Sequence, residues 1–210
     1  MNIEQDQARR LRELARQFRA SHVPKPRATL VVLVVGGYAR VGVTTVVARL
    51  AAELSRQALK IESQLPDAMP GVQRHDTDIV LIDAGVGYSQ CTEAIWNQAN
   101  LALLVTTDGR EVVLATYAAL KLAKAEHPAL PVWLLPNQCT DQHAAEVLCR
   151  RISESCERFL GTAIPAAPWL PLWNTEAEPT DGAVNVAKLA RFLRERVLSF
   201  RSVEFVEHAA

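Results

Sequence analysis

A strand-like run, a glycine-containing turn and a helix-like run follow one another near the start of the chain, and they limit the folds open to it. The run TLVVLVV (residues 29–35) is apolar at all but its first position and rich in β-branched side chains. GGYARVG (36–42) follows it, and VTTVVARLAAELSRQ (43–57) then places apolar residues at helical spacing. Since the strand run does not alternate between apolar and polar residues, we expect both of its faces to be buried, as in a parallel sheet covered by helices.

The same succession of strand and helix recurs along the rest of the chain. Further strand-like runs are DIVLIDAG, LALLVTT and PVWLLPN, at residues 78–85, 101–107 and 131–137. Helical patterns separate the later strands, at 111–126 and 141–160, and a last helix is expected at 184–200. Residues 59–77 are interpreted as one short strand and a loop, and the proline-rich stretch 162–182 as irregular. This alternation predicts an α/β fold with a doubly wound, mainly parallel sheet flanked by helices.

The composition excludes several classes of protein. The 210 residues carry 23 basic and 23 acidic side chains, so no net charge draws the chain toward nucleic acid or anionic lipid. The longest apolar stretch, residues 30–35, is far too short to span a bilayer, and the N-terminus shows no secretory signal. The four cysteines form no CxxC pair, and the five histidines have no ligand-like spacing with them. We therefore expect a soluble cytoplasmic protein with free thiols rather than a metal site or disulfides.

The first 28 residues are predicted to be an appendage to this fold. Apolar residues recur at spacings of three and four, which predicts a helix over residues 3–20 whose apolar face carries Ala8, Leu11, Ala15 and Phe18. Residues 21–28 contain two prolines, which cannot lie inside a helix, and therefore form a linker. The predicted organisation is a helical segment in residues 1–20, a linker in 21–28 and one α/β domain in 29–210.

The turn has most features of a phosphate-binding loop, GxxxxGK[ST]. In that motif the glycines let backbone N–H groups surround the phosphates, the lysine contacts the β and γ oxygens, and the hydroxyl binds Mg²⁺. Here Gly37, Gly42 and Thr44 match, but Val43 stands in place of the lysine. Asp83 ends a buried strand, as does the carboxylate beside Mg²⁺ in nucleotide hydrolases. Two plainer interpretations stay open, namely an ordinary glycine turn and an aspartate that caps the next turn.

These segments resemble the deviant-Walker P-loop ATPases of the MinD/ParA class over most of the chain. The family loop GKGGVGKTT aligns with GYARVGVTT, so that Thr44 and Thr45 match while Tyr38 and Val43 replace two lysines. IVLIDAGVG is similar to the family segment D-x-x-x-x-D-T-x-x-G, and LLPNQ to the strand whose asparagine faces adenine. The resemblance implies a degenerate nucleotide site made of Gly37, Gly42, Val43, Thr44, Thr45, Asp83 and Asn137.

One branch of that class is similar to this chain at the N-terminus as well. DQARRLR (residues 6–12) matches the DQAxxLR motif at the head of FlhG (FleN), a MinD-like regulator of flagellar number and placement. In FlhG-like proteins this helix docks on FlhF, an SRP-type GTPase, and stimulates its GTP hydrolysis. By that resemblance Gln7 would point toward the bound GTP, and the partner-binding residues would be Asp6, Gln7, Ala8, Leu11 and Arg12, the last two as anchors. The alternative is an arginine-rich, solvated helix with no such role.

The chain departs from the family at three positions that catalysis uses. Val43 replaces the phosphate lysine, and Tyr38 replaces the signature lysine that reaches across an ATP-bound dimer. No strand between Thr45 and Asp83 ends in the catalytic aspartate, for which Glu62 is a poor substitute. Losing one charge-assisted bond to phosphate costs on the order of 1.5–3 kcal/mol, which weakens ATP binding roughly 10- to 150-fold. We therefore expect a pseudo-ATPase with no catalytic residue and no required cofactor.

Two other functions stay open. A slow, active MinD-like ATPase would use Arg40, Thr44 and Asp83, the last two as Mg²⁺ ligands. Weak binding of ATP or ADP with Mg²⁺ is compatible with both a slow ATPase and a pseudo-ATPase. A BcsQ-like accessory protein of cellulose secretion would belong to a related branch whose loops can also lack the lysines. The DQAxxLR match favours the FlhG-like function over the BcsQ-like one.

The expected partners follow from the FlhG resemblance. They are a FlhF-type GTPase and other flagellar assembly proteins, with no nucleic acid and no strong membrane anchor, and dimerisation is left open. These partners would recruit the cytoplasmic protein to the membrane or the flagellar base. The amphipathic last helix is expected to lie on the sheet rather than on lipid, and Trp169 and Trp173 mark either a contact surface or ordinary packing.

Overall fold

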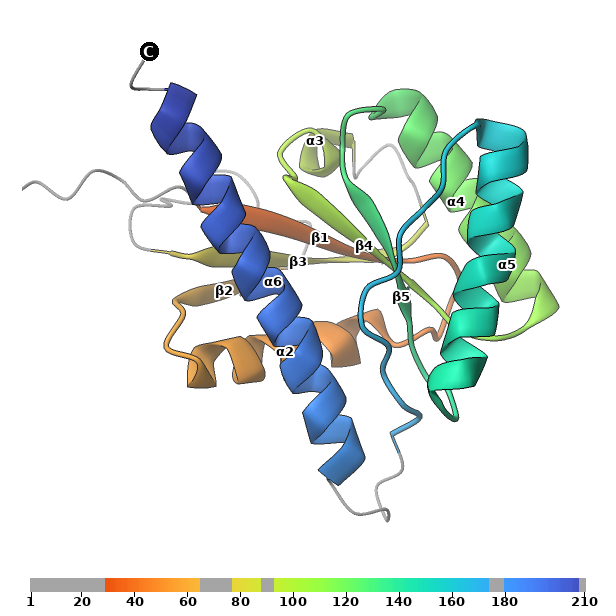
Figure 1. The fold of residues 1–210 in the computed structure, drawn as a ribbon, viewed down its shortest axis with the longest axis horizontal. Helices are drawn as coiled ribbons and strands as arrows, with labels where there is room; N and C mark the ends of the chain where they lie inside the picture. The colour runs from red at the N-terminus through yellow and green to blue at the C-terminus, as the bar shows by residue number, and fades with distance from the viewer. Residues whose placement is uncertain (1–28, 65–76, 88–92, 174–179, 208–210) are drawn as a thin grey trace, which may run out of the picture.

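The protein is built on a five-stranded sheet in which every pair of neighbouring strands is parallel (Figure 1). The structure is a computed structural model that describes residues 29–64, 77–87, 93–173 and 180–207. The strand order is β2-β3-β1-β4-β5, with bounds β1 Leu30–Gly36, β2 Ile61–Gln64, β3 Ile79–Val86, β4 Leu101–Thr106 and β5 Val132–Pro136. The order reverses at β1, which has β3 on one side and β4 on the other. The predicted doubly wound α/β fold is therefore confirmed.

Helices cover both faces of the sheet, as the uninterrupted apolar strands predicted. On one face lie α2 (Val43–Arg56) and α6 (Thr180–Glu207), and on the other α3 (Glu93–Trp96), α4 (Arg110–Glu126) and α5 (Gln142–Leu160) (Figure 1). Successive residues of β1 point to opposite faces, so Val32 and Val34 pack with α2 and α6 while Val31 and Leu33 pack with the other three helices. Each of these four side chains is at most 1% exposed, so the central strand is buried on both sides.

The last helix lies on the sheet, as expected, and is longer than its sequence pattern suggested. Leu189, Leu193 and Val197 of α6 are buried in the same cluster as α2 and β1. The helix was predicted over residues 184–200 but spans Thr180–Glu207, so it is longer at both ends. Gly182 is a weak helix former, which hid this first turn, yet here it gives room to the ring of Trp173. Among the helices of the described ranges, none combines the length and apolarity of a membrane span.

The proline-rich stretch has no helix up to residue 173, but part of it extends the sheet. The N–H of Leu134 donates to the carbonyl of Pro165 at 2.9 Å, and the N–H of Ala167 donates to the carbonyl of Leu134 at 2.7 Å. This stretch therefore runs beside β5 as an outer extended segment. The sequence did not predict this, because proline has no N–H to donate to a neighbouring strand and its presence argues against a strand. Both tryptophans of the stretch pack against the core. Trp169 lies against the cluster under α4 and α5, and the Arg49 guanidinium lies 3.6 Å from the centre of the Trp173 ring.

Two smaller expectations also have an outcome. The short strand expected in residues 59–77 is β2, an edge strand paired with β3, and Glu62 lies on it half-buried. The expected free thiols are confirmed for Cys139, Cys149 and Cys156, which are buried and unpaired. Cys91 lies outside the described residues, as do the predicted helix 3–20 and linker 21–28.

Candidate functional site

The candidate site is the glycine turn, residues 37–42, between the end of β1 and the start of α2. All five strands are parallel, so the turn lies at the same edge of the sheet as Asp83 near the end of β3 and Asn137 directly after β5. The backbone ties this edge together, because the N–H of Gly87 donates to the carbonyl of Gly36 at 2.8 Å. In doubly wound folds the crevice at the carboxyl ends of the strands, where the order reverses, is the usual ligand site.

The two glycines of the motif are required by packing. A Cβ on Gly37 would lie 2.2 Å from Oγ1 and 2.8 Å from Cα of Thr116 on α4. Gly42 has a φ of +89°, and a Cβ there would lie 2.8 Å from Nδ2 of Asn137. Both positions therefore favour glycine whatever the turn binds, since other residues would clash or be strained.

The start of α2 has the features of an anion site. Gly42 occupies the N-cap position, no side chain caps the helix there, and the first turn has no acidic residue. The N–H groups of a helix's first turn have no partner within the helix and carry partial positive charge. The side chains of Thr44 and Thr45 are exposed beside them. This part of the turn fits a phosphate group.

The residue in the lysine position is packed into the core. Val43 is 7% exposed and Val41 is 1% exposed, and both belong to the cluster between the sheet and α2 and α6. A Cβ on Gly36 would lie 3.0 Å from Cγ2 of Val43 and 2.8 Å from Cγ2 of Val41. The turn therefore folds down onto the end of β1 through two apolar side chains. The one cation within residues 37–42 is Arg40, which is exposed and has a φ of +63°.

Two side-chain amides at the end of β5 hold the turn by its carbonyl oxygens. Nδ2 of Asn137 donates to the carbonyl of Val41 at 2.7 Å, and Nε2 of Gln138 donates to the carbonyl of Arg40 at 3.1 Å. Asn137 is 1% exposed, and its Oδ1 is buried with no hydrogen-bond partner among the described residues. The family resemblance places Asn137 against adenine, whereas in this structure its side-chain amide is bonded to the turn.

Asp83 lies one strand away from the turn. It pairs in register with Val34 of β1 and is 6% exposed, and its Oδ1 accepts a hydrogen bond from the N–H of Gly85 at 3.1 Å. That bond is the turn-capping contact of the plainer interpretation. The other carboxylate oxygen, Oδ2, accepts no hydrogen bond from the part of the chain that the structure describes, and a carboxylate oxygen at this edge is a suitable Mg²⁺ ligand.

Tyr38 stands where the resemblance places the signature lysine. It is 40% exposed, and its hydroxyl donates to Oε2 of Glu111 on α4 at 3.4 Å. This contact ties the turn to the start of α4 at the surface and brings no positive charge to the site.

The groups at the turn are suited to bind the phosphates and Mg²⁺ of Mg-ATP, but they lack the cation that catalysis of phosphoryl transfer needs. Backbone N–H groups at the start of α2 and the hydroxyls of Thr44 and Thr45 suit phosphate oxygens, and Thr44 with Asp83 suits Mg²⁺. Position 43 supplies a buried apolar side chain in place of the cation that would meet the β and γ oxygens. In the described part of the chain, no group of three or more metal-ligating side chains is found.

The structure adds residues that the sequence pattern did not single out. Thr116 packs on Gly37 and shares a 2.9 Å hydrogen bond with Thr106 at the end of β4, and Gln138 and Val41 hold the turn. The only available signal for Gln138 was its place directly after Asn137. The predicted partner-binding residues Asp6, Gln7, Ala8, Leu11 and Arg12 lie outside the described residues.

Sheet order, helix layers and glycine turn together define the fold of the MinD/ParA class of P-loop ATPases. Solved structures with this fold include MinD in the MinC:MinD cell division complex of Aquifex aeolicus, with a TM-score of 0.61 and 12% identity over 80% of this chain and 96% of that chain. MinD from Pyrococcus horikoshii OT3, complexed with Mg-ADP, has a TM-score of 0.58 and 15% identity over 79% and 96%. A ParA family ATPase from Chlorobium tepidum TLS has a TM-score of 0.55 and 13% identity over 88% and 100%. No protein-family model and no curated protein sequence matches this chain.

Proposed function

We propose that this chain is a FlhG-like regulator of flagellar number and placement that keeps the MinD/ParA fold without ATP turnover. The observation that carries the absence of turnover is the burial of Val43, which lies in the core at the position of the phosphate lysine. Tyr38 adds no charge in place of the signature lysine. An in-trans charge of that kind can be worth roughly 10³–10⁵ in the rate of phosphoryl transfer, so its loss together with that of the phosphate lysine disables catalysis.

The turn keeps a weak affinity for ATP or ADP with Mg²⁺. The Pyrococcus MinD with the same fold is complexed with Mg-ADP. Here the phosphates would be held by the N–H groups at the start of α2, and Mg²⁺ by Thr44 and Asp83. The nucleotide would then act as a structural ligand of the turn.

The regulatory activity resides in the N-terminal motif DQARRLR. A glutamine can orient the water that attacks the γ-phosphate, which is the role that the FlhG resemblance gives to Gln7. Arg9, Arg10 and Arg16 supply positive charge for an acidic surface on the GTPase. The α/β domain would then position this motif, and FlhF would be the partner.

The ATPase part of the proposal is tested on the purified full chain. Calorimetry with ATP and Mg²⁺ should show weak binding, and an assay of released phosphate should show no turnover above the background of buffer. Clear turnover that disappears in Asp83→Ala would overturn the pseudo-ATPase and support a slow ATPase instead. The uncapped start of α2 beside exposed Thr44 is the observation that favours that second candidate.

The FlhF part is tested by GTP hydrolysis. The full chain should accelerate GTP hydrolysis by FlhF, and Gln7→Ala should remove the acceleration. Gln17→Ala changes a glutamine outside the motif and should leave the acceleration intact. Equal stimulation by wild type and Gln7→Ala, or no stimulation at all, would refute the assigned role.

A further inference from the structure

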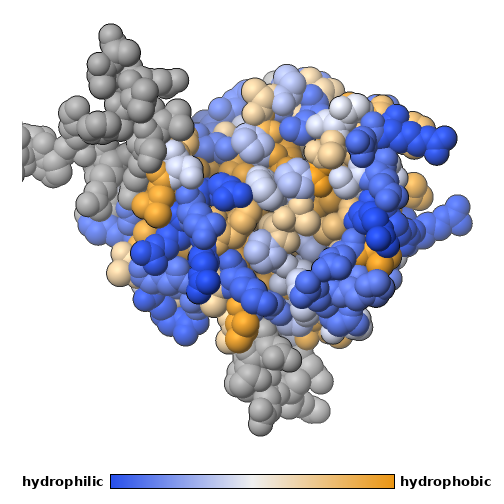
Figure 2. All heavy atoms as spheres, viewed as in Figure 1, coloured by the Kyte–Doolittle hydropathy of each residue, from blue (hydrophilic) through white to orange (hydrophobic). Residues whose placement is uncertain are grey.

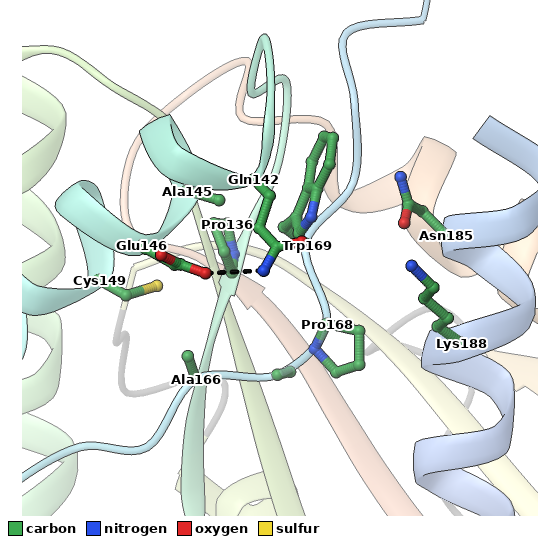
Figure 3. A pocket seen from close by; sticks show the side chains of 11 residues that line it. Pro136, Gln142, Ala145, Glu146, Cys149, Ala166, Pro168, Trp169, Asn185 and Lys188 are labelled. Carbon is green, nitrogen blue, oxygen red and sulfur yellow. Dashed lines mark hydrogen bonds between the residues drawn. The ribbon is translucent and has the colours of Figure 1, made fainter. Parts of the chain in front are cut away.

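A groove of about 250 Å³ lies at the outer edge of the sheet beyond β5, between α5 and α6 (Figure 3). Its floor is the extended segment around Ala166, Ala167 and Pro168. One wall is α5 and the other is α6. Viewed from this side, the segment between the two helices forms a band of apolar to neutral residues between two hydrophilic ridges (Figure 2).

The floor of the groove presents unused backbone groups. Leu134 of β5 bonds to the carbonyl of Pro165 and to the N–H of Ala167, so the N–H and C=O of Ala166 point away from β5, as parallel pairing requires. Ala166 is exposed, and neither group has a hydrogen bond among the described residues. An outer edge with free N–H and C=O groups is a template for an added strand.

The α6 wall presents an amide and an ammonium group to the groove. Asn185 is 6% exposed and has no hydrogen-bond partner among the described residues. Its carboxamide points from α6 into the groove, next to the ammonium group of Lys188 one turn further along (Figure 3). Lys188 likewise has no ion pair within the described part of the chain.

The α5 wall combines two apolar and two polar side chains. Ala145 and Cys149 line it, and the carboxylate of Glu146 accepts a 2.7 Å hydrogen bond from Nε2 of Gln142. Trp169 and Pro168 close the groove between the two walls (Figure 3). The two walls lie on opposite faces of the sheet edge. The α6 wall has a cation and an amide, and the α5 wall has two small apolar side chains beside the bonded pair Gln142 and Glu146.

We propose that this groove binds an extended peptide of a partner protein, which adds to the sheet at Ala166 and alternates acidic and apolar residues. Side chains of an added strand point alternately to the two faces, so the acidic residues meet Lys188 and Asn185 while the apolar ones meet Ala145 and Cys149. The main chain pairs with the N–H and C=O of Ala166.

The test uses the ¹⁵N-labelled full chain and two blocked octapeptides, one of alternating valine and glutamate and one of alternating valine and lysine. The glutamate peptide should shift the amide signals of Ala166 and Ala167 and the side-chain amide of Asn185, and it should slow hydrogen exchange at Ala166. The lysine peptide should not. Lys188→Glu should weaken binding of the glutamate peptide about tenfold, because an ion pair becomes a repulsion.

The matched control is Lys121→Glu, which reverses an exposed lysine of α4 that does not line the groove and should leave the affinity unchanged. Equal shifts with both peptides, shifts confined to other residues, or no shift would overturn the proposal. So would slow exchange at Ala166 in the peptide-free chain, since this chain's own residues would then cover the edge.

Discussion

The side-chain amide of Asn137 donates a 2.7 Å hydrogen bond to the carbonyl of Val41, across 96 positions of sequence. This bond joins the end of β5 to the glycine turn after β1, with the end of β4 between them in the sheet. The amide packs so closely on Gly42 that no side chain fits there. The protein itself therefore holds the turn in shape. Side-chain amides bind its carbonyl oxygens, and Val41 and Val43 pack into the core.

Removing this amide should destabilise the fold. Asn137→Ala leaves the buried carbonyl of Val41 without its side-chain donor, so we expect the free energy of unfolding in urea to fall by about 1–3 kcal/mol. Gln138→Ala removes a longer bond made by an exposed side chain and should change it by less than about 0.5 kcal/mol. Equal losses in the two variants would show that the Asn137 bond is not the one that holds the turn.

Restoring the lysine should restore nucleotide affinity without restoring turnover. Val43→Lys places a cation at the start of α2, where its stem can follow the apolar surface and its ammonium can reach phosphate. We expect ATP to bind roughly 10- to 150-fold more tightly by calorimetry, with no phosphate release. Val43→Met is the matched control, since it is long and uncharged. If both variants bind ATP with the same affinity, the turn does not hold phosphate.

Replacing Gly182 of α6 with alanine should destabilise the protein, although alanine is the better helix former. Alanine normally favours a helix over glycine, by up to about 1 kcal/mol, with the full effect in a helix interior and less in a first turn such as this one. Here a Cβ would lie 2.2 Å from Cζ3 of Trp173, so Gly182→Ala must move the ring from its place beside Arg49. We expect a loss of about 1–3 kcal/mol in urea unfolding. In a Trp173→Ala background the same substitution should become stabilising, and a loss of equal size there would contradict the packing explanation.

The three buried thiols should make the protein sensitive to alkali. Burial raises the pKa of Cys149 to about 12 and those of Cys139 and Cys156 to about 11, each from an ordinary value of 9.0. The unfolded chain therefore loses these protons first as pH rises. Below pH 9 the thiols are protonated in both states, so the free energy of unfolding has its full value. Between pH 9 and 11–12 it falls, by on the order of 1 kcal/mol per thiol for each pH unit.

Urea unfolding at pH 8, 9, 10 and 10.5 measures this loss. Cys149→Ala removes one of the three groups, so its stability should fall less steeply above pH 9 than that of the wild type, by about one third of the slope. Parallel curves for the two proteins would show that Cys149 does not contribute.

The sequence predicted most elements because their signals are local. The strands β1, β3, β4 and β5 are short apolar runs, and α4 and α5 have clear helical spacing. It missed the first turn of α6, where Gly182 weakened the pattern, and the sheet-edge role of the segment around Ala166, where prolines suggested only irregular chain. Both depend on a partner from elsewhere in the chain, namely Trp173 and Leu134.

The sequence by itself determined the layered α/β architecture and the glycine turn, because hydrophobic periodicity and glycine positions act over a few residues. The family resemblance also assigned Asp83 and Asn137 to one nucleotide site. Only the tertiary structure decided what these residues contact. The burial of Val43, the bond from Asn137 to Val41 and the free edge at Ala166 beside Asn185 join segments far apart in the chain. Such contacts depend on how helices and strands pack around one core, and no local pattern records them.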